Sequence, residues 1–185
     1  RNNLVTADTY NVYAPPVEAP TFGARTLQVD PADLIASPFG WHDTDGITGA
    51  DFTVTEGNNA TAYTDIDGDN VMDAGSQADG GAPMMFDFSL DLASAPSTYR
   101  DAVVTQLFYL ASRAHDIFYA YGFDEAAGNF QTNNYGRGGI GSDAVRVEAQ
   151  DGPGVNTANF ATPIDGNPPR MQLSLWNFAE PNTDV

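Results

Sequence analysis

The stretch SAPSTYRDAVVTQLFYLASRAHDIFYAYG, residues 94–122, carries the clearest secondary-structure signal in the chain. Its apolar residues recur at steps of three and four, the spacing of one face of an α-helix. One stripe consists of Val103, Leu107, Leu110, Ala114, Ile117 and Tyr121, and the adjoining stripe of Val104, Phe108, Ala111, His115 and Phe118. So wide an apolar face predicts a helix that is buried on most sides. With Ser97 as N-cap and Gly122 as C-terminal stop, the helix would have about 24 residues and a length of roughly 36 Å.

Short segments of alternating polarity before and after this helix predict β-strands. They are residues 84–92 (MMFDFSLDL), 143–150 (DAVRVEAQ) and 171–176 (MQLSLW). The chain shows no internal repeat and no linker that would divide it. We therefore predict a single unit over residues 1–185 of the α+β class, in which a twisted, mostly antiparallel β-sheet packs on one long helix.

The loop AYTDIDGDNVMD, residues 62–73, predicts a calcium site. Alternate positions of a tight loop can point carboxylate oxygens at one centre, and calcium takes six to eight oxygen ligands with tolerant geometry. The predicted ligands of this structural ion are Asp65, Asp67, Asp69, the carbonyl of Val71, and Asp73. The loop is not an EF-hand, because its glycine stands at the fourth position instead of the sixth, and it looks more like the acidic loops of thrombospondin-type repeats. The alternative interpretation is a solvated acidic turn without a fixed ion.

The composition argues against several kinds of partner and chemistry. Twenty-five acidic residues face seven basic ones, which gives a net charge of −18. This charge repels nucleic acid and anionic membranes, and no apolar run approaches the roughly 20 residues that span a bilayer. The chain has no cysteine, which excludes disulfides and thiolate catalysis. An acidic, calcium-binding chain favours a secreted, extracellular protein, because weak calcium sites fill outside cells.

The residues alone reveal no catalytic apparatus. The chain has two histidines, His42 and His115, and no HExxH motif. His115 lies in an apolar stripe of the predicted helix, as a buried, hydrogen-bonded core histidine does. His42 is predicted to lie in a turn beside Trp41. Hydrolysis through the two histidines is a third interpretation that no motif supports.

The segment 156–161 lies between two predicted strands and precedes Pro163. An exposed sheet edge that ends in proline can receive an extended peptide through main-chain hydrogen bonds. The plainer interpretation is an ordinary long hairpin loop.

Several long motifs, in order along the chain, strongly resemble the fungalysin family of secreted zinc metallopeptidases. They are SPFGWH (37–42), GNN (57–59), LFYLASRAHDIFYAYGFDEAAGNFQTNNYGRGG (107–139), DAVRVEAQDG (143–152) and NTANFATPIDGNPPRMQLSLW (156–176). The resemblance extends from about residue 9 to Trp176. It implies that the chain begins near the point where such enzymes lose their propeptide. It also implies that the zinc helix follows the equivalent of Trp176, whereas this chain stops at Val185.

The resemblance implies the N-terminal lobe of a thermolysin-like catalytic domain, without its C-terminal zinc-binding lobe. That missing lobe and a peptide or protein substrate would be the partners. The intact enzyme would hydrolyse peptide bonds with zinc as cofactor, whereas this chain would hold no catalytic residue and be inactive alone. The predicted substrate-binding residues are Asn156, Thr157, Ala158, Asn159 and Phe160. Ala158 would act through its main chain, and Thr157 replaces an Asn of the family. The competing class is a calcium-stabilised, non-catalytic β-rich binding module, such as an adhesin domain.

Overall fold

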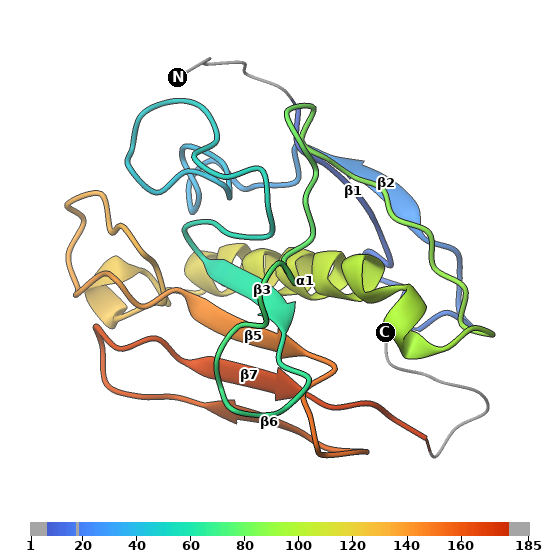
Figure 1. Ribbon diagram of the computed structural model, residues 1–185. Coiled ribbons are helices and arrows are strands. Elements are labelled where there is room, and N and C mark those ends of the chain that lie inside the picture. Colours follow the sequence, from blue (N-terminus) through green and yellow to red (C-terminus); the bar gives the residue numbers. More distant parts are fainter. Residues whose placement is uncertain (1–6, 18, 178–185) are drawn as a thin grey trace.

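The computed structural model describes residues 7–17 and 19–177 and places one long helix between two β-sheets (Figure 1). The helix is α1, Arg100–Ala120. The strands are β1 (Thr9–Val12), β2 (Thr26–Val29), β3 (Ala60–Thr64), β4 (Met85–Phe86), β5 (Val145–Ala149), β6 (Ala158–Ala161) and β7 (Arg170–Leu173), and two short 3-10 helices span Pro96–Thr98 and Glu125–Ala127. Over these described residues, α1 and the other helices are too short or too polar to cross a membrane.

Both sheets are mixed, so the α+β class is confirmed but the mostly antiparallel pairing is not. The first sheet has the order β2-β1-β4 and the second the order β3-β5-β7-β6. β1 with β2 and β6 with β7 are antiparallel, whereas β1 with β4, β3 with β5, and β5 with β7 are parallel. Parallel neighbours need a long crossover, and α1 lies in the connection from β3 to β5. Alternating polarity locates strands but does not give their direction, which is why the sequence did not predict this pairing.

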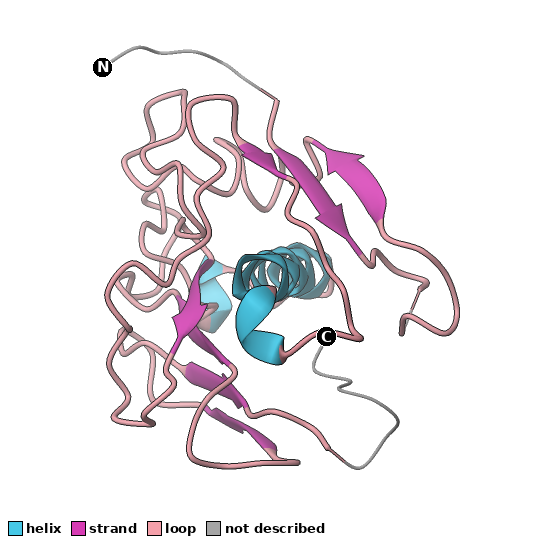
Figure 2. Cartoon of the chain, turned by 45° about the vertical axis from the view of Figure 1, so that its right-hand side comes forward, coloured by secondary structure: helices cyan, strands magenta, loops and turns pink. Residues whose placement is uncertain are grey.

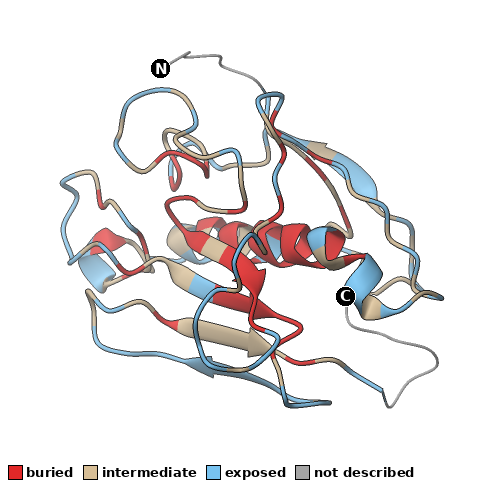
Figure 3. Ribbon diagram, in the orientation of Figure 1, coloured by how far each residue is buried: buried red, intermediate tan, exposed pale blue. Residues whose placement is uncertain are grey.

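The two sheets enclose α1, and this position explains its wide apolar face. The helix contacts β1 of one sheet and β3 and β5 of the other, and Figure 2 shows it nearly end-on between the sheets. Buried residues continue from the first three turns of α1 into β3 and β5 (Figure 3). The largest fully buried side chains of the core include Trp41, Tyr10, Phe86 and Phe108.

The helix is shorter than predicted and less buried at its C-terminal end. It begins at Arg100 rather than beside Ser97, because residues 96–98 form a separate 3-10 turn and Tyr99 occupies the N-cap position without a side-chain cap. Four residues of the predicted apolar stripes are exposed, and they lie from the middle of the helix to its C-cap: Leu110, Ile117, Phe118 and Tyr121. The sheets therefore cover mainly the N-terminal half of α1.

The strand predicted at residues 84–92 is reduced to the two residues of β4. Phe86 is buried as predicted, and Phe88 and Leu90 still pack against the core. Beyond Phe86 the strand pairing ends, and the carbonyl of Phe88 accepts a hydrogen bond from the Arg25 guanidinium at 2.9 Å, which also donates to the Asn11 carbonyl of β1 at 3.3 Å. An arginine side chain thus takes the place of a strand partner.

Candidate functional site

Within the residues that the structure describes, strand β6 forms the open edge of the four-stranded sheet. It pairs on one side with β7, with Ala158 opposite Leu173 and Phe160 opposite Met171. All four of its residues are exposed, and in Figure 1 it is the outermost strand of its sheet. The segment that the sequence marked as a possible peptide-binding edge therefore lies at a sheet edge.

The hydrogen-bond alternation of this edge decides which main-chain groups face outward. The amide of Ser174 donates to the carbonyl of Thr157 at 3.1 Å, so this opposed pair is a hydrogen-bonded one. In an antiparallel ladder such pairs alternate with non-hydrogen-bonded ones. Asn159 therefore directs its amide and carbonyl toward β7. Ala158 and Phe160 direct theirs away from the sheet, where an added strand would lie.

The residues before β6 are held by the segment after β7. Asn156 has a left-handed backbone (φ 57°), and its amide donates to the carbonyl of Leu175 at 2.7 Å. Its side-chain oxygen accepts from the amide of Asn177, also at 2.7 Å. Gly154 packs so closely that an added Cβ would lie 2.8 Å from the Ser174 hydroxyl. These contacts fix where the edge strand begins.

The acidic loop brings together three of its four aspartates. Carboxylate oxygens of Asp65, Asp67 and Asp73 lie within 4.8 Å of one another, whereas Asp69 is absent from this group. The Asp69 carboxylate instead accepts a hydrogen bond from the amide of Val71 at 2.8 Å. Asp65 is fully buried and accepts three main-chain amides, those of Gly68, Asp69 and Asn70.

A second acidic group, which the sequence reasoning missed, adjoins the first. Carboxylate oxygens of Asp65, Glu148 and Asp151 also lie within 4.8 Å of one another, and all three residues are buried. The alternation of residues 143–150 put Glu148 on the polar side of its strand. That side is covered because the acidic loop folds over the end of β5, where the amide of Gly152 donates to the Asp65 carbonyl at 2.9 Å.

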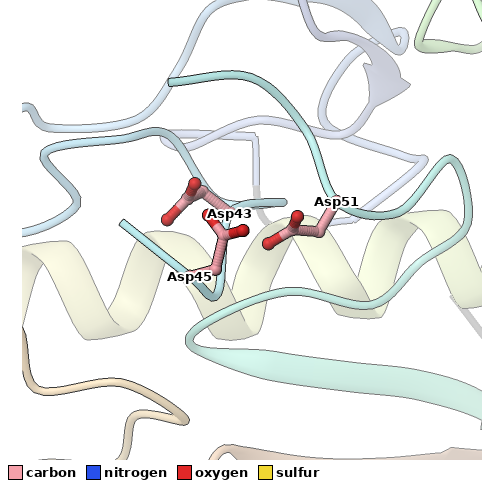
Figure 4. Close-up of side chains that lie close together, drawn as sticks. All are labelled: Asp43, Asp45 and Asp51. Carbon is pink, nitrogen blue, oxygen red and sulfur yellow. The ribbon is translucent and has the colours of Figure 1, made fainter. Parts of the chain in front are cut away.

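A third acidic group, Asp43, Asp45 and Asp51, lies at the other end of β3 (Figure 4). The Asp43 carboxylate accepts from the amide of Gly46 at 2.8 Å and from the Tyr135 hydroxyl at 3.1 Å. Burial raises the pKa of Asp43. The two hydrogen bonds oppose this shift, and the charges of Asp51 and Asp45 add to it. The group closes the turn between Asp43 and Asp51, since the Asp51 carboxylate accepts from the amide and hydroxyl of Thr44.

Both histidines have protein partners in the core. His42 is fully buried. Its Nε2 lies 2.7 Å from the Tyr10 hydroxyl, and its Nδ1 lies 2.8 Å from the Glu56 carbonyl oxygen. It lies in a turn, as predicted, but its side chain is buried in the core and stacks against the ring of Phe86. His115 contacts the Asp116 carboxylate at 3.1 Å, in keeping with the hydrogen-bonded role predicted for it. Burial lowers the pKa of His42 to about 4, against two weaker main-chain effects.

The fold is an α+β arrangement of one long helix between two mixed sheets, with the exposed strand β6 at the edge of one sheet. The profile of the family described as "Fungalysin metallopeptidase (M36)" matches residues 9–185. The chain belongs to the fungalysin metallopeptidase family.

Curated relatives agree over almost the whole chain. "Extracellular metalloproteinase 5" of Trichophyton tonsurans is 44% identical over 182 residues, which cover 98% of this chain and 29% of the relative. The protein of the same name from Arthroderma otae is 45% identical over 183 residues, covering 98% and 28%. "Extracellular metalloproteinase MEP" of Fusarium vanettenii is 42% identical over 177 residues, covering 95% and 27%. The chain thus spans less than a third of the length of these relatives.

Proposed function

We propose that this chain is the lobe that holds the substrate backbone in a secreted zinc metalloendopeptidase. The observation that carries the proposal is the open edge at β6 in a member of the fungalysin family. The relatives are named extracellular metalloproteinases, and a protease must bind an extended segment of its substrate. Main-chain pairing accepts many sequences, because every residue except proline supplies the same donor and acceptor.

In this proposal Ala158 and Phe160 pair with the substrate main chain. Their amides and carbonyls face outward by the alternation of the ladder, so an added strand would continue the sheet beyond β6. Asn156 and Thr157 would line the entry to this edge, and the side chain of Asn159 would lie beside the bound peptide. Phe160 also anchors the strand, with its ring 6.2 Å from that of Phe130.

The described residues do not fit a zinc site. Within residues 7–17 and 19–177, no histidine belongs to a group of three or more ligand residues close enough to share an ion. His42 is occupied by Tyr10 and Glu56, and His115 contacts Asp116 and Asn129. We infer that zinc and its ligands belong to the remainder of the enzyme, the partner lobe, and that the isolated chain hydrolyses no peptide.

The partner lobe would cover the exposed end of α1. Phe118 and Tyr121 are exposed there, at 57% and 87%, and Ile117 lies beside them. The nearby rings of Phe123, Phe130 and Phe160 form a chain of contacts from this end to β6.

We expect the isolated chain to self-associate through this surface, so that light scattering at high concentration gives a mass above the 19.7 kDa of the chain. A clean monomer would contradict the proposal that the partner lobe covers the exposed end of α1.

Calcium is the proposed structural ion of the acidic loop. Asp65, Asp67 and Asp73 supply the oxygen ligands that lie together, and Asp69 and Val71 would have to turn inward to join them. All ligands are oxygens, which suits calcium rather than zinc.

Proline substitution on the edge strand tests the substrate assignment. In the full-length enzyme, Ala158→Pro removes an outward amide and should lower kcat/KM for a fluorogenic peptide by about tenfold or more. Its pairing with β7 stays intact, so the melting temperature should change little. Asn159→Pro is the matched control, because it removes an amide that bonds β7 and should lower the melting temperature. An Ala158→Pro enzyme with wild-type kcat/KM would refute the edge-strand role.

A further inference from the structure

Three buried carboxylates meet where the acidic loop lies on the end of β5. Asp65 comes from the loop, Glu148 from the strand and Asp151 from the turn that follows it. Asp65 and Glu148 are fully buried and Asp151 is 8% exposed. Like charges at this separation, out of water, repel strongly unless a positive charge lies among them.

The positive charge that the described protein supplies here is too small to balance the three carboxylates. Nε of Arg170 lies 3.1 Å from Oε1 of Glu148. Gln172 contributes only a long amide contact of 3.4 Å to Asp151. The protein thus leaves an excess of negative charge in a buried place.

One oxygen of this group has no partner. The Tyr63 hydroxyl donates to Oε1 of Glu148 at 3.1 Å, which is also the oxygen nearest Arg170. Oε2 of the same carboxylate is buried and accepts no hydrogen bond from any residue that the structure describes. A buried carboxylate oxygen without a partner is costly, and a cation among the three carboxylates would remove that cost.

We propose that Asp65, Glu148 and Asp151 form a binding site for a divalent cation of the calcium class. This inner site lies between the loop and β5, with Asp65 shared between it and the outer loop carboxylates. Carboxylate ligands alone select hard cations, of which calcium best tolerates an irregular set. The inference deepens the calcium proposal above, which placed the ion among loop residues only.

The inner site would tie the acidic loop to the sheet that carries the substrate edge. Asn70 of the loop already contacts β7, through its carbonyl to Arg170 and its side chain to Gln172. β7 is the strand on which β6 pairs. A cation at the end of β5 would therefore fix the position of β7 and, through it, the register of the edge strand.

Terbium luminescence tests the inner site in the full-length enzyme. Tb3+ substitutes for Ca2+, and the Tyr63 ring beside Glu148 would sensitise its emission. We expect saturable emission that calcium displaces. Glu148→Gln and Asp151→Asn should each weaken the calcium affinity, measured by the displacement of terbium, by about tenfold or more, because each removes a charged ligand. Asp101→Asn, which changes an exposed carboxylate of α1 outside all three acidic groups, is the control and should alter it by less than about threefold.

The folded state of each variant is checked by circular dichroism, and Asp151→Asn guards against a Glu148 variant that fails to fold. A calcium affinity unchanged by both inner substitutions would overturn the proposal, as would an absence of saturable emission from the unmodified enzyme. Since the measurement needs no substrate, its failure is separate from a failure of the edge-strand role.

Discussion

The Tyr10 hydroxyl lies 2.7 Å from Nε2 of His42, at the centre of the core between the two sheets. The other ring nitrogen, Nδ1, faces the Glu56 carbonyl at 2.8 Å. A carbonyl can only accept, so Nδ1 carries the proton and Nε2 accepts from Tyr10. The histidine is thus held neutral, in a stack with the rings of Phe86 and Phe108.

This neutral histidine predicts an acid-sensitive fold. Burial lowers the His42 pKa from 6.5 to about 4, so between these values the unfolded chain binds a proton that the native chain does not. Stability is therefore full above about pH 6.5 and is lost as the pH falls toward 4, by about 3 kcal/mol in total. Urea unfolding at pH 7 and pH 4.5 should show a smaller loss for His42→Gln than for the unmodified chain. Equal losses of stability in the two proteins would contradict the assignment of the acid sensitivity to His42.

Asp116 is the second buried polar centre and should be costly to remove. It is fully buried on α1, and its carboxylate accepts from Trp41 Nε1 at 2.9 Å, from the Ser37 hydroxyl at 2.7 Å and from the Asp33 amide at 2.9 Å. Asp116→Ala would leave these donors unpaired and should lower the free energy of unfolding by about 3 kcal/mol or more. Asp101→Ala, in the exposed first turn, is the control and should cost about 0.5 kcal/mol. Similar urea midpoints for the two variants would refute this role.

Asp116 also illustrates what the sequence could and could not predict. The spacing of apolar residues predicted the long helix, because that signal lies within the helix itself. The stripe placed His115 in the core but said nothing of Asp116, whose partners are 75 to 83 positions away in the chain. A buried carboxylate cannot be told from a solvated one until its distant donors are known.

The sequence likewise predicted one part of the candidate site and could not predict another. Flanking strands and Pro163 marked residues 156–161 as a possible sheet edge, and β6 is an edge strand. The aspartate spacing grouped Asp65 with Asp67 and Asp73 because they share one loop. Glu148 could not be added, since only the folding of that loop over β5 buries it. Parallel pairing was missed for the same reason: it depends on a crossover and not on local alternation.

Gly57 should tolerate no side chain. A Cβ at this position would lie 1.9 Å from the Trp41 carbonyl oxygen, and the adjacent Asn58 amide donates to that same oxygen at 2.8 Å. Gly57→Ala must therefore push two main-chain segments apart and should cost about 3 kcal/mol or more. Gly75→Ala is the control, because nothing lies within 4 Å of its added Cβ and only its left-handed backbone (φ 71°) is strained, at about 1 kcal/mol. Thermal melting of both variants would show the difference, and equal melting temperatures would contradict the close contact.

Removal of calcium should destabilise the chain through Asp65, which belongs to both acidic groups around the loop. An ion that binds only the native state stabilises it, by about 2.7 kcal/mol at a hundredfold excess over its Kd. For a chain of this size, that corresponds to a melting temperature about 5–10 °C lower in a calcium-selective chelator. Asp65→Asn is the matched variant, and its melting temperature should be the same with and without calcium. Superimposable melting curves of the unmodified chain in the two conditions would exclude a structural ion at both groups, and a calcium effect that survives Asp65→Asn would place the ion elsewhere.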